Sequence, residues 1–396
     1  MTDRPAPARL VAIDVARCLA LLGMVATHVL DERRADGSLT AAQWLAGGRA
    51  SALFAVLAGV SMALVTGRRH PLAGAARGRA SAGLVVRAVL VGALGLLLGT
   101  LGTGIAVILT YYAVLFVLAL PFLGLRAPTL AALAVGWMVA APVLSHVVRP
   151  ELPERDFASP TLQQLLDDPS GLLAELTFTG YYPAVPWLAY VLTGLAVGRL
   201  DLSSRRTASL LALGGGLLAV GATVVSRMLT ARPEVQRALL DDPPATDADA
   251  AALLERIAEG LPGSTPTGGA GEWLLVVAPH TATPFDLAQT IGSALLVVGA
   301  ALLLVGAARP VPRHAVAVFF GAGTMTLSLY SLHVVARTPG LLPDALRDSY
   351  LFHVLLLLGT GLMLTAAGLR GPLEATVGGV ARTVAGRPQT RPRLDP

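Results

Sequence analysis

Apolar runs of about 20 residues recur along nearly the whole chain, with short polar segments between them. An α-helix of that length can cross the hydrocarbon core of a bilayer. The pattern therefore predicts an all-α, polytopic membrane protein with about ten transmembrane helices. The predicted spans are 10–30, 50–66, 83–101, 104–124, 127–148, 182–200, 208–229, 286–307, 315–337 and 350–369.

The apolar runs do not divide the chain into separate soluble domains. We expect a single transmembrane domain over residues 1–370 and a short cytoplasmic tail over 371–396. Two longer polar segments, 149–181 and 230–285, interrupt the series of spans and are predicted to be outer loops. Part of the second loop, 248–260, has the composition of a short surface helix.

Arginine is distributed unevenly between the loops. The loop at 67–82 holds four Arg and no acid, and the segment after residue 369 holds five more Arg. The segment 149–181 carries six acids against two Arg, and 230–285 carries eight acids against three Arg. Because basic residues concentrate in cytoplasmic loops, an even number of spans places both termini in the cytoplasm and both acidic loops outside.

Apolar residues make up 54% of the 396 residues and charged residues 14%, whereas about 25% charged is typical of soluble proteins. This excludes a soluble enzyme and a nucleic-acid partner, and the net charge of +5 reflects Arg in short loops. All 30 basic residues are Arg, which excludes a Schiff-base or Walker-type lysine. The single Cys18 excludes an internal disulfide and a cysteine-based metal site, and no metal is expected. The Arg-only, Ala-rich composition is typical of a GC-rich bacterial genome and predicts a bacterial plasma (inner) membrane location.

Three polar side chains interrupt the first predicted span: Asp14, Arg17 and His28. At 100° per residue, Arg17 and His28 lie within about 20° of one another around the helix and roughly 16 Å apart along it, and Asp14 lies within about 60° of both. One helix face therefore carries a polar stripe. Charged residues inside a span almost always face the bundle interior or a wet cavity. The structural alternative is an Asp14–Arg17 ion pair with a histidine at the water boundary.

The ninth predicted span is the second unusually polar helix. His333 and Arg337 are four residues apart and share a face of that helix. In the predicted topology, His333 and Arg337 lie at the outer level of His28. The functional interpretation places His333 and Tyr330 beside His28 as acceptor or oxyanion contacts. A histidine at the membrane interface, with hydroxyls bonded to their own helix, is the structural alternative.

Four further residues are candidates on position alone. His280 precedes the eighth span on the outer side, and Arg49 opens the second span there. Tyr111 and Tyr112 lie in the middle of the fourth span, where a hydroxyl can donate to a carbonyl. An exposed loop histidine, an arginine that reaches to water and two packing tyrosines are the structural alternatives.

Several sequence segments resemble known membrane acyltransferases. Arg17 and His28 form an Arg-x10-His pattern after an Asp at the start of the first span, similar to the opening signature of polytopic membrane acyltransferases. The segment GRASALFAVLAGVSMAL (48–64) resembles the second span of bacterial proteins grouped with the heparan-alpha-glucosaminide N-acetyltransferase family. Similar segments that follow in the same order are YYPAVPWLAYVLTGLAVGRL (181–200), Pro279-His280, MTLSLYSLHVV (325–335) and GPLE (371–374).

The resemblance implies a transmembrane, acyl-CoA-dependent N- or O-acetyltransferase. Such proteins take an acyl group, here acetyl from acetyl-CoA, on the cytoplasmic side and pass it through the helix bundle. The acceptor at the outer face is a glycan, a lipid or a small metabolite. A histidine of near-neutral pKa is a common base for this chemistry, and it can instead carry the acyl group as a nucleophile.

We therefore assign candidate roles as follows. His28 and Asp14 are the candidate catalytic residues. Arg17, Arg49, Tyr111 and Tyr112 are candidates for binding the acyl-CoA. His280, Tyr330 and His333 are candidates for binding the acceptor.

Two other functional classes remain open from the residues alone. A transporter or channel would use the Asp14, Arg17 and His28 stripe as a proton or anion path. A membrane scaffold without chemistry would leave the stripe without a role. Assembly of several copies of the chain in the bilayer is compatible with any of these functions.

Overall fold

The computed structural model describes residues 8–153, 155, 159–240, 257–308 and 310–385. Within these residues the regular secondary structure is helical. A single isolated β-bridge joins Arg33 and Leu39. The all-α prediction is confirmed. Residues 386–396 of the expected tail, and most of the helix expected over 248–260, lie outside the described residues.

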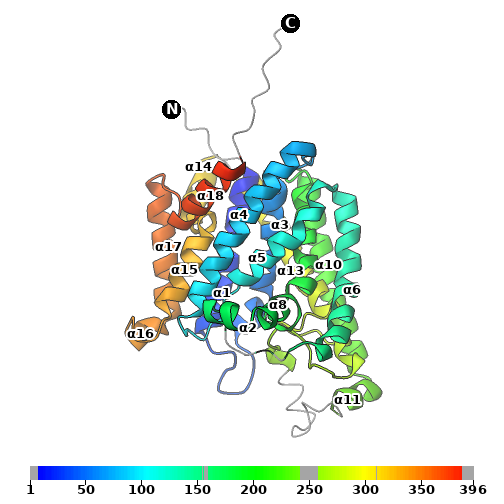
Figure 1. Ribbon diagram of the computed structural model, residues 1–396. Helices are drawn as coiled ribbons and strands as arrows, with labels where there is room; N and C mark the ends of the chain where they lie inside the picture. The colour runs from blue at the N-terminus through cyan, green and yellow to red at the C-terminus, as the bar shows by residue number, and fades with distance from the viewer. Residues whose placement is uncertain (1–7, 154, 156–158, 241–256, 309, 386–396) are drawn as a thin grey trace.

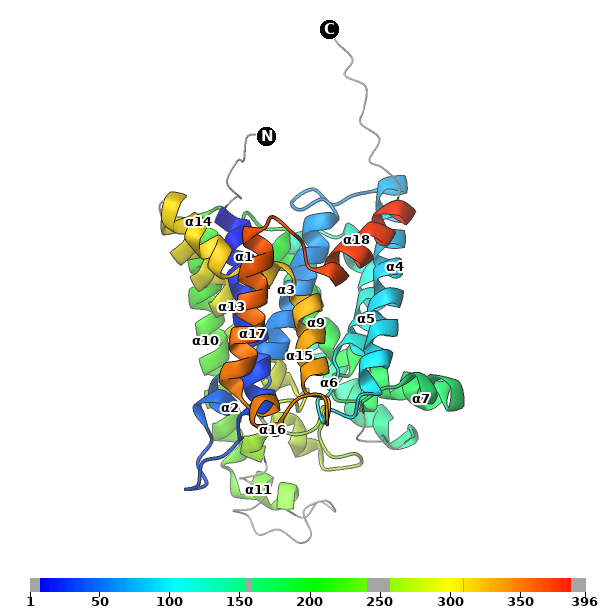
Figure 2. The ribbon, with the colours of Figure 1, turned by 90° about the vertical axis from the view of Figure 1, so that its left-hand side faces the viewer.

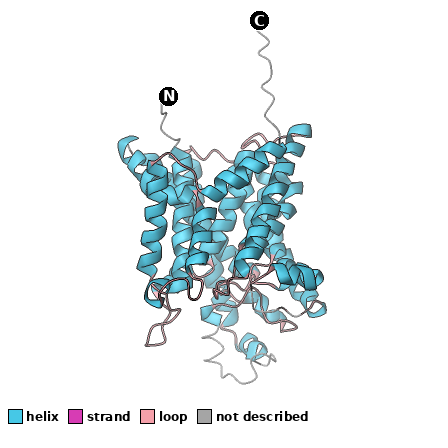
Figure 3. Ribbon diagram, turned by 60° about the vertical axis from the view of Figure 1, so that its left-hand side comes forward, coloured by secondary structure: helices cyan, strands magenta, loops and turns pink. Residues whose placement is uncertain are grey.

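The helices form a bundle with two distinct ends. The start of α1 (Ala8–Val29) and the helix α18 (Pro372–Ala385) lie at one end, while the short helices α2 (Ala41–Ala46), α11 (Pro233–Leu240) and α16 (Asp344–Arg347) lie at the other (Figures 1 and 2). Figure 3 shows the connecting loops gathered at these two ends. We call the end with α2 and α16 the loop end.

Six helical segments are long and apolar enough to cross a membrane. Four shorter apolar helices account for the remaining predicted spans. The six long segments are Val11–Val29, Ala41–Val65 (α2 with α3, Arg49–Val65), α4 (Gly74–Gly99), Ala127–Glu151 (mainly α6, Ala127–Val148), α10 (Arg205–Thr230) and α13 (Pro284–Ala307). The four shorter ones are α5 (Leu109–Ala119) with the 3₁₀ turn Leu120–Gly124, α9 (Ala184–Gly198), α15 (Thr326–Ala336) and α17 (Tyr350–Ala366).

The ninth segment is broken, so the prediction of one continuous helix over 315–337 is wrong. The helix α14 (Pro310–Phe319) ends before a 3₁₀ turn at Gly321–Thr324, and α15 starts anew at Thr326. This turn presses against α1, since a Cβ atom on Gly323 would lie only 1.8 Å from the carbonyl oxygen of Asp14. The close approach requires glycine there and interrupts the helix.

Glu374 satisfies the exposed start of α15. The first N–H groups of a helix have no partner within the helix. The Glu374 carboxylate accepts hydrogen bonds from the backbone N–H of Leu327 at 2.6 Å and of Ser328 at 3.2 Å. The hydroxyl of Ser328 also donates to Glu374. The start of α18 therefore caps the second half of the broken segment.

The fourth segment also differs from the prediction, because its helix begins at Leu109 rather than near 104. Non-helical backbone at membrane depth needs partners inside the protein. The Ser159 hydroxyl accepts from the N–H of Val107 at 3.1 Å and donates to the carbonyl of Ile105 at 2.8 Å. The hydroxyl of Tyr330 accepts from the N–H of Ile108 at 3.3 Å.

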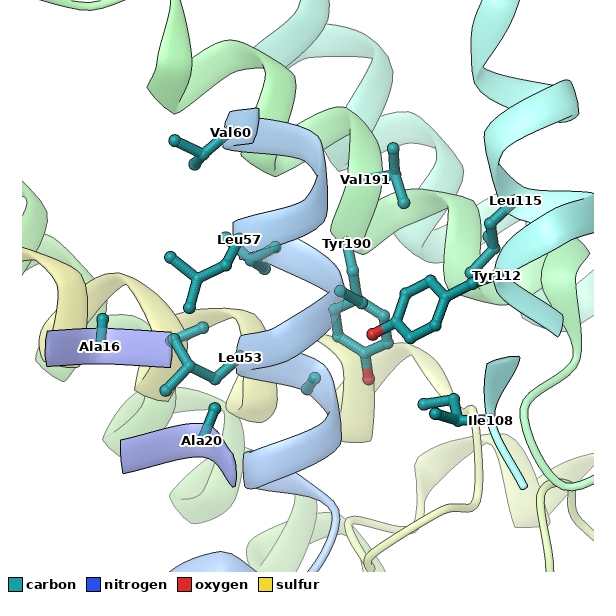
Figure 4. Packing of buried hydrophobic residues seen from close by; sticks show 14 of the residues in the cluster. Ala16, Ala20, Leu53, Leu57, Val60, Ile108, Tyr112, Leu115, Tyr190 and Val191 are labelled. Atoms are coloured by element: carbon teal, nitrogen blue, oxygen red, sulfur yellow. The ribbon is translucent and has the colours of Figure 1, made fainter. Parts of the chain in front are cut away.

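Small residues let the central helices approach closely. A Cβ atom on Gly59 of α3 would lie 2.3 Å from the carbonyl oxygen of Val191 on α9. Figure 4 shows Leu53 and Leu57 of α3 between the α1 alanines on one side and the α9 tyrosine on the other. This packing fixes α1 against α3, and so fixes the direction of the polar stripe.

Candidate active site

The stripe on α1 begins with an ion pair that also bonds to a hydroxyl on α3. Arg17 Nη1 lies 2.9 Å from Asp14 Oδ1, and the two side chains are each 23% exposed. Arg17 Nη2 donates to the hydroxyl of Ser61 on α3 at 2.6 Å. The Asp14–Arg17 ion pair, which was the structural alternative for the stripe, is present, and Ser61 is an additional partner.

At the loop end of α1, His28 joins a series of three histidines. Its Nδ1 lies 3.2 Å from Nε2 of His333 on α15. The Nδ1 atom of His333 lies 3.1 Å from Nδ1 of His353 on α17, and Nε2 of His353 lies 2.8 Å from the carbonyl oxygen of Arg347. His333 and His353 are fully buried. We call His28, His333 and His353 the histidine relay.

The three rings of the relay lie in a row and do not surround a common centre. The planes of the His28 and His333 rings are within 9° of parallel, with centroids 5.4 Å apart, and the His333 and His353 rings meet edge to face. The described residues contain no group of three or more side chains placed to hold a metal ion. The three rings therefore form a hydrogen-bonded series that begins at the α1 stripe.

His28 lies on the wall of a cavity of about 380 Å³ at the loop end, which we call the outer cavity. The loop after α1 adds Glu32 to this wall. Segments far along the chain add Tyr181, His280 and Arg337. The fold thus brings His28, His280 and Arg337 to the wall of one chamber.

The wall of the outer cavity includes two carboxylates. Glu32 and Glu259 both line the cavity. Burial, with the nearby carboxylate of Glu259, raises the pKa of Glu32 above its usual value. Glu259 is also paired with Arg33. Carboxylates and an amide, from Gln43, therefore face the space beside His28.

His280 sits in an unusual backbone conformation. Its φ angle is 57°, in the left-handed region that non-glycine residues seldom adopt. Its ring packs against Tyr181, with centroids 4.7 Å apart. Burial lowers the pKa of His280 to about 4, and its Nδ1 has no hydrogen-bond partner among the described residues. Such strain is common at functional sites, where the surrounding structure enforces it.

A second cavity of about 110 Å³ lies deeper in the bundle, and we call it the inner cavity. Arg87 of α4, Tyr112 of α5 and Tyr330 of α15 are on its wall. The buried hydroxyl of Tyr112 has no hydrogen-bond partner among the described residues. Met24 lines both the inner and the outer cavity.

The remaining candidates have other surroundings. The Tyr111 hydroxyl donates to Glu175 at 3.0 Å and accepts from the backbone N–H of Tyr181 at 3.2 Å. Arg49 donates to the carbonyl of Trp44 and is not on the wall of either cavity. Tyr330 is on the inner cavity rather than beside His28. These three side chains have structural partners of their own.

Sequence reasoning missed His353 and Arg87. His333 lies in the last turn of α15, and His353 lies in the first turn of α17, on either side of a short connection. Helices joined by a short loop are antiparallel neighbours. That symmetry about the connection was the available signal for His353. Arg87 was masked by the general abundance of arginine.

The family profile described as heparan-alpha-glucosaminide N-acetyltransferase, catalytic, matches residues 9–228, more than half of the chain. A comparison with curated proteins finds no match. The matched segment includes Asp14, Arg17 and His28, and it ends before His280 and His333. The chain belongs to the heparan-alpha-glucosaminide N-acetyltransferase catalytic family.

Proposed function

We propose that this protein moves an acetyl group from cytoplasmic acetyl-CoA, through the helix bundle, to an acceptor at the outer face of a bacterial plasma membrane. The observation that carries the proposal is the position of His28. This residue lies in the family-matched segment and on the wall of a polar cavity, at the end of α1 away from the N-terminus. A titratable ring at that place suits acyl transfer.

The proposed topology has ten crossings and cytoplasmic termini. The start of α1 and α18 lie at the same end of the bundle (Figure 2). The arginine-rich loop at 67–82 and the acidic segment at 149–181 support the orientation. In this orientation the outer cavity opens toward the outside, and the inner cavity lies on the way from the cytoplasm.

The donor path is proposed to run through the inner cavity. Arg87 supplies a positive charge on its wall, and Tyr112 supplies a hydroxyl that is free to donate to an amide or thioester carbonyl. Met24, shared by both cavities, marks the passage to His28. The Asp14–Arg17 pair, with its partners satisfied, shapes the bundle at the cytoplasmic half of the stripe.

The proposed chemistry follows from the position of His28. As the acceptor oxygen or nitrogen attacks the thioester carbonyl, His28 takes its proton. The bond from the carbonyl carbon to sulfur then breaks, and the proton passes to the leaving thiolate. The products are the acetylated acceptor and CoA with a free thiol. A base in this role contributes about 10²- to 10⁴-fold to the rate.

The acceptor is proposed to be a glycan. The outer cavity presents Glu32, Glu259 and Gln43 together with the ring of Tyr181. Carboxylates and amides accept and donate hydrogen bonds to sugar hydroxyl and amino groups. The family name refers to a glucosaminide, so an α-glucosaminide is the first acceptor to test.

Sided proteoliposomes test this function directly. The full-length protein is reconstituted with radiolabelled acetyl-CoA on one side and an α-glucosaminide on the other, and acetylated product and free CoA thiol are measured. We expect product only when acetyl-CoA faces the arginine-rich loops, whose side is determined by protease protection. Acetyl-CoA that neither binds nor reacts, together with solute or ion flux that needs no CoA, would replace this proposal with the transporter alternative.

A further inference from the structure

We propose that His333 and His353 are positioning residues that hold His28 in a single tautomer, with the proton on Nδ1 and the lone pair on Nε2. The catalytic meaning of this arrangement rests on the proposed acetyl transfer. The arrangement itself is a property of the resting protein. It also changes the role expected for His333, from an acceptor contact to a support for His28.

The direction of the hydrogen bonds follows from the last partner in the relay. A backbone carbonyl oxygen only accepts, so Nε2 of His353 carries the proton that is donated to Arg347 at 2.8 Å. In a neutral imidazole the other nitrogen is then an acceptor. Nδ1 of His353 therefore accepts, at 3.1 Å, from Nδ1 of His333.

His28 is the donor in the next hydrogen bond of the relay. Since Nδ1 of His333 donates, its Nε2 is the acceptor, and the hydrogen bond of 3.2 Å is donated by Nδ1 of His28. Nε2 of His28 then has no proton and is the nitrogen left for the cavity. A single carbonyl, three rings away, thus decides which nitrogen of His28 acts as the base.

The carbonyl at the end of the relay is itself held in place. Arg337 Nη1 donates to the carbonyl oxygen of Arg347 at 3.0 Å and pairs with Asp348. Arg347 lies at the end of α16, and its N–H donates to the carbonyl of Pro343 at 2.9 Å. The acceptor that fixes the tautomers is therefore anchored by an arginine and a short helix.

The relay orients His28 but does not conduct a proton away from it. It ends on a carbonyl oxygen, which cannot take up a proton at neutral pH, and no carboxylate lies within it. Arg337 acts on both ends of the relay and Asp348 on the His353 end. At the other end, His280, Glu32 and Glu259 share the wall of the outer cavity with His28. The proton that Nε2 takes from the acceptor consequently returns to the leaving thiolate. A buried partner that fixes the tautomer of a catalytic histidine is worth orders of magnitude in rate in serine proteases.

Nitrogen NMR tests the tautomer without any need for activity. The full-length protein is labelled with ¹⁵N-histidine in nanodiscs, and the His28 signals are assigned by their loss in His28→Gln. We expect one His28 tautomer in the wild type, with a protonated Nδ1. His333→Leu should give a mixture of the two tautomers. His333→Gln should restore the single tautomer, because the glutamine oxygen can accept from Nδ1 of His28.

Kinetics then separate positioning from substrate contact. His333→Leu should lower kcat by about 100-fold, the cost of a misplaced catalytic group, and leave the KM for both substrates unchanged, whereas His333→Gln should recover most of kcat. His353→Leu, one ring further from the cavity, should behave like His333→Leu. A raised KM for the acceptor would show that His333 contacts substrate, and a protonated Nε2 on wild-type His28 would overturn the relay. A single Nδ1–H tautomer without acetyl transfer would support the relay and refute the proposed function.

Discussion

The two ends of the polar stripe on α1 differ in how their side chains are partnered. Arg17 is held by neighbours of the first two membrane helices, Asp14 at 2.9 Å and Ser61 at 2.6 Å. His28 is held by His333, which is 305 positions away along the chain and 3.2 Å away in space. One end is charged and local, and the other is uncharged in the proposed tautomers and long-range.

Because of this difference, we expect the charged end to affect the stability of the fold and the His28 end to affect catalysis. The charged end can form as soon as α1 meets α3, because all three partners are there. The His28 end exists only when α15 and α17 have joined the bundle, because its partners lie on those helices. We therefore expect substitutions at the charged end to change the free energy of unfolding and those at the His28 end to change the rate of transfer.

Replacement of His28 is the largest test of this contrast. His28→Ala removes the proposed base, so we expect acetyl transfer to fall by about 10²- to 10⁴-fold. The affinity for acetyl-CoA, measured by calorimetry in nanodiscs, should stay within a few-fold of the wild type, because the donor path lies deeper in the bundle. The initial rate is measured from release of free CoA thiol.

A histidine outside the relay gives the matched control. His314 lies on α14 and is exposed, so His314→Ala should keep the wild-type rate. A His28→Ala protein that still transfers acetyl at more than a tenth of the normal rate would refute the role of this end.

Asp14→Asn tests the charged end. The change leaves the Arg17 guanidinium without its anionic partner, and a hydrogen bond to a charged group contributes about 1.5–3 kcal/mol. We expect the free energy of unfolding to fall by about 2 kcal/mol, seen as a lower melting temperature in detergent. The transfer rate per folded molecule should change little.

The double variant Asp14→Asn/Arg17→Gln sharpens the result. Removing both charges avoids an uncompensated cation in the bundle, so we expect part of the lost stability to return. If Asp14→Asn instead stops transfer in a protein of normal stability, Asp14 takes part in catalysis, as the sequence first suggested.

The protonation of His280, which shares the outer cavity with His28, makes the stability of the folded protein depend on pH. Burial lowers the pKa of His280 to about 4, from 6.5 as its usual value. Between these values the unfolded chain binds a proton and the folded protein does not, so stability falls as pH falls from about 6.5 to about 4. One pKa unit corresponds to about 1.4 kcal/mol. Melting temperatures at pH 7.5 and 5.5 should therefore differ less in His280→Gln than in the wild type, and an equal difference in both proteins would contradict the assignment to His280.

The sequence predicted the helices because helical membrane spans depend on local composition. All ten predicted segments contain apolar helices, six of which are long enough to cross a bilayer. The breaks were not predicted. Gly323 interrupts the ninth segment because it touches the backbone of Asp14, and the extended stretch before Leu109 is satisfied by Ser159 and Tyr330. Such contacts join distant parts of the chain and leave no periodic signal.

The local sequence pattern also predicted the part of the site that lies on a single helix. Helix periodicity placed Asp14, Arg17 and His28 on one face, and the ion pair between the first two is present. Periodicity carries no information on which helix faces that stripe. His353 therefore went unnoticed although it lies 3.1 Å from His333, because their proximity depends on how α15 and α17 pair.

Ser61→Ala gives the smallest expected effect and the finest test of the comparison. The Ser61 hydroxyl accepts from Arg17 at 2.6 Å and donates to the carbonyl of Leu57 at 2.6 Å. Its loss removes one neutral partner while Asp14 remains, so the free energy of unfolding should fall by about 0.5–1.5 kcal/mol with no change in transfer rate.

The matched control for Ser61→Ala is Ser293→Ala on α13. Among the described residues, the Ser293 hydroxyl donates only to its own helix, to the carbonyl of Gln289 at 2.9 Å. Its removal should leave the melting temperature almost unchanged, so the difference between the two variants measures the Arg17 contact across helices. Equal melting temperatures for the two variants would mean that α1 and α3 are held together by apolar packing alone. The charged end of the stripe would then stabilise α1 alone and not the contact between α1 and α3. That result would strengthen the contrast with the His28 end, whose partner lies 305 positions away along the chain.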